Sequence, residues 1–147
     1  MSQPNSNSVV LTAAEVAQSK ENKKRRHRTV SQLPVFRNAV MILDFLVDIT
    51  ARSPKAFRKF TDSSFEMVNE LMRQIGLAQE YRNEVRFECI TEAISFVYVL
   101  KAHFVVYQNK GMLSKDLLNK ARKLCDDTVG QLVAWRSSAT REGSDLE

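Results

Sequence analysis

The run of residues 93–107 constrains the fold of this chain more than any other feature. Almost all of its 15 side chains are apolar, and the two basic residues within it are Lys101 and His103. The run does not alternate and is too long for an ordinary strand, so it predicts a helix. A helix that crosses a membrane needs about 20 mostly apolar residues. We therefore expect a helix buried in a protein core, and no membrane contact.

The composition also favours a helical protein. The 147 residues include 4 Gly and 3 Pro, fewer than sheets with tight turns or glycine-rich phosphate loops require. A chain of this length suits one domain with a full core. The 2 Cys cannot form a disulfide framework, and the polar residues 1–8 show no secretory signal. These features predict a reduced, cytoplasmic protein.

Apolar residues at helical spacing predict four helices. The first begins at Pro34 and ends near residue 53, and the third spans about residues 80–109. The second ends near residue 79 and has two possible starts, Pro54 and Ser63. Gly111 marks the end of the third helix, and Ser114 caps a fourth that ends near residue 136. Short connections favour an all-α, antiparallel up-down four-helix bundle.

The chain divides into three predicted parts: a flexible basic N-terminal arm (residues 1–32), the bundle (residues 33–136) and a flexible C-terminal tail (residues 137–147). Within the arm, Thr12 begins a capping-box pattern. Helices one and three carry more apolar surface than one core requires. Self-association would bury it, or neighbouring helices and the arm would cover it, and we favour self-association. Gly130 is unfavourable inside a helix unless a neighbour approaches closely, and we expect Trp135 to lock against that neighbour.

Two basic groups are candidates for contact with RNA. The net charge of +5 comes mainly from the arm, and clustered cations bind polyanions by releasing counterions. The second group alternates with Phe57 and Phe60, a pattern that suits phosphate contact with base stacking, although we expect both rings to be core residues. The predicted nucleic-acid-binding residues are Lys20, Lys23, Lys24, Arg25, Arg26, Arg28, Lys55, Arg58 and Lys59.

Catalytic and metal-binding patterns are missing from the sequence. Glutamates at positions 80, 84, 88 and 92 form a stripe, but no Glu-x-x-His pair accompanies it, so we interpret it as a solvated face or a cation-binding edge for a partner. Cys89 and Cys125 lack a C-x-x-C pattern and a nearby histidine, and small buried apolar residues are the better interpretation. No phosphate-loop, dinucleotide or nucleophile-elbow motif is present. We expect no enzyme, metal or cofactor.

Three segments carry a family resemblance. They are LPVFRNAVMILDFLVDITARSPK, EAISFVYVLKAHFVVYQNKGMLS and DDTVGQLVAW. With them, residues 33–136 resemble the Avd-like four-helix accessory proteins of diversity-generating retroelements, which are related to the ribosomal-RNA intervening-sequence four-helix proteins. The resemblance implies a pentameric ring or barrel with basic surfaces. It also implies a non-enzymatic accessory that binds a reverse transcriptase and its template RNA and supports mutagenic cDNA synthesis.

Two other functions stay open at this point. The first is an oligomeric protein–protein adaptor that does not bind nucleic acid, in which the third helix and the glutamate stripe bind a partner. The second is a metal- or thiol-dependent enzyme built on a helical bundle. RNA binding that depends on salt separates the leading hypothesis from the adaptor, and a bound metal would favour the enzyme.

Overall fold

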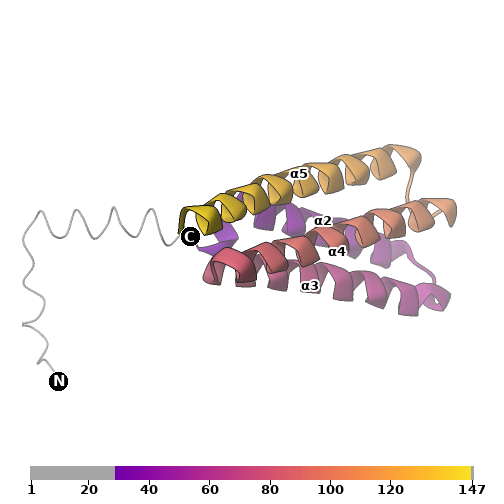
Figure 1. The fold of residues 1–147 in the computed structure, drawn as a ribbon. Helices are drawn as coiled ribbons and strands as arrows, with labels where there is room; N and C mark the ends of the chain where they lie inside the picture. Colours follow the sequence, from indigo (N-terminus) through magenta and orange to yellow (C-terminus); the bar gives the residue numbers. More distant parts are fainter. Residues whose placement is uncertain (1–28, 147) are drawn as a thin grey trace, which may run out of the picture.

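The computed structural model describes residues 29–146, with side chains up to residue 139. The described chain is helical and contains no strand, and its four long helices pack against one another (Figure 1). The prediction of a helical bundle is confirmed at this level. The elements are η2 (Val30–Gln32), α2 (Pro34–Arg52), η3 (Lys55–Phe57), α3 (Arg58–Glu80), α4 (Asn83–Asn109) and α5 (Lys115–Leu146).

Several helix ends lie where local sequence signals predict them. Pro34 is the first residue of α2, and the helix stops before the Ser53-Pro54 step. Gly111 has a φ of +76°, and the Met112 amide donates to the Tyr107 carbonyl at 2.9 Å, which closes the end of α4. At the start of α5, the amide of Leu117 donates to Ser114 Oγ at 3.2 Å.

Three predicted ends are wrong. α3 begins at Arg58, because the residues after Pro54 first form the short η3 turn. α4 begins at Asn83 rather than at Glu80, since α3 itself continues to Glu80 and the next two residues are extended. α5 continues to Leu146, although we expected a tail from residue 137. Ala139 is buried, so α5 still packs against the bundle beyond its predicted end.

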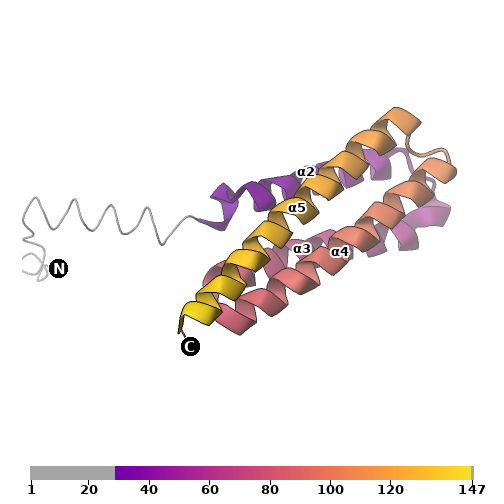
Figure 2. The ribbon, with the colours of Figure 1, turned by 45° about the horizontal axis from the view of Figure 1, so that its top comes forward.

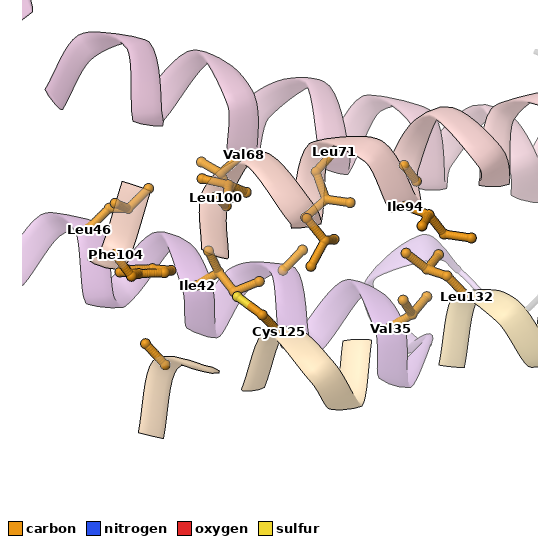
Figure 3. Close-up of a cluster of buried hydrophobic side chains, with 14 of the residues drawn as sticks. Val35, Ile42, Leu46, Val68, Leu71, Ile94, Leu100, Phe104, Cys125 and Leu132 are labelled. Atoms are coloured by element: carbon orange, nitrogen blue, oxygen red, sulfur yellow. The ribbon is translucent and has the colours of Figure 1, made fainter. Parts of the chain in front are cut away.

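The helices form a square in cross-section. α3 and α5 each pack against both α2 and α4, so α2 and α4 lie diagonally opposite (Figure 2). Side chains of all four helices meet along the centre (Figure 3). On α4, helical spacing predicts one inward stripe, and that stripe is buried as a whole: Ile90, Ala93, Val97, Leu100, Phe104 and Tyr107.

Two helices differ in detail from the predicted faces. α2 buries only one of its two apolar faces, the one with Ile42 and Leu46, whereas Val40 and Val47 are exposed. In α5, helical spacing predicts an inner face of Leu117, Ala121, Leu124, Thr128, Leu132 and Trp135. Ala121, Thr128 and Leu132 are buried as predicted. Leu117, Leu124 and Trp135 are half-buried, whereas Leu118 and Cys125 are buried instead. The predicted inner face of α5 is therefore confirmed only in part.

By length and composition, α4 could cross a membrane, the one described helix that passes this test. A single such helix is weak evidence, because the core helix of a soluble protein has the same character. One face of α4 forms the bundle core, and Lys101 on its side pairs with Asp126 of α5 at 2.6 Å. The expected absence of membrane contact stays a prediction.

Candidate nucleic-acid interface

Two connections meet at one end of the bundle. The hydroxyl of Ser53, between α2 and α3, donates to the sulfur of Met112, between α4 and α5, at 3.1 Å. Segments that lie almost sixty residues apart in the sequence are therefore neighbours. Any charge carried by the two connections combines into one surface.

This surface is strongly basic, and we call it the basic end. It comprises six exposed cations: Arg52, Lys55, Arg58, Lys59, Lys110 and Lys115. Residues 52–62 and 109–116, which hold these cations, also hold two exposed carboxylates, those of Asp62 and Asp116. Between described side chains, no ion pair involves any of the six cations. The basic end can therefore offer several cations at once to a polyanion.

The aromatic rings between these cations belong to the core. Phe57 and Phe60 are half-buried and pack against the core side chains. The ring of Phe60 lies 4.6 Å from that of His103 and 5.1 Å from that of Tyr107. The expectation that both rings are core residues is met in part, because both pack against the core but stay half-buried. The basic end therefore offers phosphate contact mainly through its cations.

The predicted site residues are not gathered in one place. Lys55, Arg58 and Lys59 lie at the basic end, whereas the six cations at positions 20–28 lie outside the described residues. The first described residue, Thr29, precedes α2 and lies at the other end of that helix. The 19 residues of α2 separate the two ends by about 28 Å.

Sequence reasoning missed three members of the basic end, Arg52, Lys110 and Lys115. They belong to separate stretches of the chain, so no local pattern joins them to Lys55. The predicted topology nonetheless indicates that these residues lie together. Helices of similar length with short connections place alternate connections at the same end of a bundle.

A buried polar cluster joins α3 to α4 behind the basic end. Ser64 Oγ lies 2.7 Å from His103 Nδ1 and 2.5 Å from the Tyr107 hydroxyl. Burial lowers the pKa of His103 and raises that of Tyr107, which the Ser64 hydrogen bond partly offsets. A serine beside a histidine is the pairing of many hydrolases, but Ser64 and Tyr107 are fully buried. This cluster therefore links two helices and presents no hydroxyl to a substrate.

The two cysteines lie in the core as predicted. Cys89 and Cys125 are both buried and unpaired with each other. Burial raises the pKa of both thiols, that of Cys125 to about 12, so neither is a thiolate near neutral pH. Among the described residues, no group of histidine, cysteine, aspartate and glutamate side chains is arranged to hold a metal ion.

Comparison with known proteins gives no relative. No family model, curated protein or solved structure matches this chain. The Avd-like resemblance therefore rests on the sequence segments quoted above, and the structure agrees with it only in being a helical bundle.

Proposed function

We propose that this protein is a non-enzymatic RNA-binding accessory that acts as a homo-oligomer beside a reverse transcriptase. As the Avd-like resemblance implies, it supports template-RNA-primed, mutagenic cDNA synthesis in a diversity-generating retroelement. The observation that carries the proposal is the basic end, where cations of two connections meet without carboxylate partners. Contact with phosphates needs such a cluster and needs no catalytic group.

The proposal includes an antiparallel up-down topology. Contacts between helices support it, because residues early in one helix lie beside residues late in the next. Lys101 contacts Asp126, whereas Thr91 accepts a hydrogen bond from Arg136 at 3.3 Å. Between α2 and α5, Asn38 donates to Gln131 at 3.2 Å, while Ser53 reaches Met112.

Self-association would multiply the charge that RNA meets. Val40, Met41 and Val47 are exposed on α2, with 43%, 48% and 51% of their surface accessible. An apolar patch of this kind favours contact between copies, and a pentamer is what the resemblance implies. Light scattering at micromolar concentration should give a mass well above 16.8 kDa. A monomer at that concentration would overturn this part of the proposal.

The RNA test compares two charge-matched triple variants. Lys55→Gln, Arg58→Gln and Lys59→Gln remove cations from the basic end. Arg37→Gln, Lys120→Gln and Arg122→Gln remove as many exposed cations from the sides of α2 and α5. Affinity for single-stranded RNA is measured over a salt series.

The basic-end variant should lose affinity and flatten the slope of log affinity against log salt by about 2, since each phosphate contributes roughly 0.7. The control variant should change the slope much less. Equal losses in both variants would mean that RNA responds only to total charge. The basic end would then not be a site.

The adaptor remains a second candidate, and one observation favours it. α4 exposes Tyr98 and Val99 on the side away from the core, where a partner protein could pack. An adaptor would show no salt-dependent RNA binding in the wild-type chain. Purification of the tagged protein with and without nuclease treatment separates the two candidates, because partners held by RNA are lost with the nuclease.

A further inference from the structure

The side of α4 that faces away from the core has two chemically different halves. Toward the start of the helix, Glu84, Glu88 and Glu92 are all exposed. Residues four positions apart share one helix face, so the three carboxylates form a continuous stripe. The helix dipole favours Glu84 in the first turn, but its effect falls off before Glu88 and Glu92.

The second half of the same side is apolar. Tyr98 is 56% exposed and Val99 40%, and Ala102 is exposed one turn further on. Val106 continues the stripe half-buried. We call the whole side, from Glu84 to Val106, the outer face of α4.

The bundle leaves this face uncovered. α3 and α5 pack against the other sides of α4, and α2 lies diagonally opposite (Figure 2). No ion pair between described side chains involves the three glutamates. The nearest cations on the flanks have other contacts: Arg86 donates to the carbonyls of Ala78 and Tyr81, and Arg136 lies over the ring of Phe87.

We propose that residues 9–28 of the same chain dock along the outer face of α4. Residues 9–17, VVLTAAEVA, are mostly apolar, and residues 20–28 hold six lysines and arginines. α4 presents its carboxylates first and its apolar half second. A segment that runs opposite to α4 therefore brings cations to carboxylates and apolar side chains to apolar side chains. A uniformly apolar patch would not select one direction in this way.

The attachment point of the segment fits this placement. η2, which directly follows Thr29, packs against α2 and α3. It lies at the end of the bundle where α3 finishes and α4 begins (Figure 1). With helices 8–10 Å apart, α2 and α4 are separated by about 14 Å across the square. The outer face points away from α2, so the crossing also spans the α4 radius of about 5–6 Å, and about six extended residues bridge the total of roughly 20 Å.

The remaining length is also sufficient. From Glu84 to Val106 the outer face extends about 33 Å along α4. With the last six residues used for the crossing, residues 9–22 cover about 21 Å as a helix, which reaches from Glu84 to Tyr98, and up to about 48 Å when extended, which covers the whole face. Lys20 then lies over the carboxylates, and Lys23 and Lys24 lie beside Glu84, where the crossing reaches α4. The tether raises the local concentration of the segment to the millimolar range, which favours the same chain over a second copy.

Docking does not depend on the proposed RNA function, so it is tested without RNA. A carbodiimide joins a lysine amine to a carboxylate only when the two are in contact. The full-length protein is treated with it, and the linked peptides are identified by mass spectrometry. Lys20, Lys23 and Lys24 should be joined mainly to Glu84, Glu88 and Glu92. The internal controls are three exposed carboxylates on other faces, Asp44, Asp48 and Glu66.

A mixture of isotopically heavy and light chains identifies the source of the arm. If the two peptides of every link have the same mass, heavy or light, the arm and the stripe belong to one chain, and the proposal is supported. Mixed-mass links would mean that a second copy supplies the segment, and would overturn it. Links spread evenly over the stripe and the control carboxylates would overturn it as well, because they show only random encounters.

The apolar contact is tested by a photo-crosslinker. The full chain carries benzoylphenylalanine in place of Ala14, which should label peptides from the second half of α4. Tyr98→Glu should reduce this labelling at least several-fold, whereas Val40→Glu on α2 should leave it unchanged. The triple variant Glu84→Gln, Glu88→Gln and Glu92→Gln should reduce labelling too. Labelling that neither set of changes affects would refute docking on this face.

Discussion

The buried hydroxyl pair between α3 and α4 gives the sharpest test of the fold energetics. Tyr107 is fully buried, and its hydroxyl has Ser64 Oγ as its hydrogen-bond partner at 2.5 Å. Ser64 itself has two further neighbours, His103 Nδ1 at 2.7 Å and the Phe60 carbonyl at 3.3 Å. The two members of the pair therefore differ in what their removal leaves behind.

Ser64→Ala leaves the Tyr107 hydroxyl buried without a partner. Such a group costs about 1–3 kcal/mol, and the lost bond to His103 brings the expected decrease in unfolding free energy to about 2–3 kcal/mol. Tyr107→Phe removes the hydroxyl but leaves Ser64 with two partners, so about 1 kcal/mol is expected. The double variant should cost about 1 kcal/mol less than the sum, because no hydroxyl remains orphaned.

Urea unfolding followed by far-UV circular dichroism measures all three variants. Ser95→Ala is the matched control, since Ser95 is exposed and donates only to the carbonyl of Glu92 in its own helix. Its effect should stay within about 0.5 kcal/mol. If Ser64→Ala costs no more than Ser95→Ala, or if the two core changes are simply additive, water satisfies the Tyr107 hydroxyl and the reasoning is wrong.

Three further predictions concern single residues. Gly130 is exposed, and no described residue lies within 4 Å of an added Cβ, so the expected close approach of a neighbouring helix is wrong for residues 29–139. Gly130→Ala should therefore raise the unfolding free energy by about 0.5–1 kcal/mol, measured as a higher melting temperature. A loss of stability would instead place Gly130 in a contact between copies. Trp135 is half-buried under Arg86, whose guanidinium lies 5.8 Å from the ring centre, so Trp135→Ala should cost about 2 kcal/mol by thermal melting, less than for a fully buried ring. Because burial lowers the pKa of His103, the folded state binds a proton less readily than the unfolded state, and stability should fall as pH drops from about 6.5 through that lowered pKa. Melting curves of wild type and His103→Gln recorded below about pH 6.5 check this loss of stability. Equal pH dependence of the two melting temperatures would refute the role of His103.

Periodicity predicted the helices better than it predicted their faces. In α4 the predicted inward stripe is buried as expected, but the residues predicted to widen it are not all inside, since Val85 and Val99 are exposed. α2 has two adjacent apolar faces, and only the position of α3 and α5 decides that Ile42 lies inside and Val40 outside. In α5, Leu117 and Leu118 are neighbours in sequence and equally apolar. Which of them points inward depends on the packing of the whole helix.

The candidate site shows the same limit. Lys55, Arg58 and Lys59 form a local cluster, so the sequence reveals them directly. Lys110 joins them only because two connections meet at one end of the bundle, a tertiary fact. The contact of Ser64 with His103 spans 39 positions and has no local signal at all.

The charges of the bundle are separated along its length, and this separation affects how the arm and RNA would compete. The carboxylate stripe lies near the start of α4, whereas the basic end lies at the opposite end of the same helix. An arm docked on the stripe therefore leaves the basic end exposed as the first contact for a polyanion. If RNA binds as proposed, each phosphate contact that an arm cation gains would replace a carboxylate contact. The salt dependence contributed by the arm is consequently smaller than its six cations suggest, since counterions return to the uncovered glutamates.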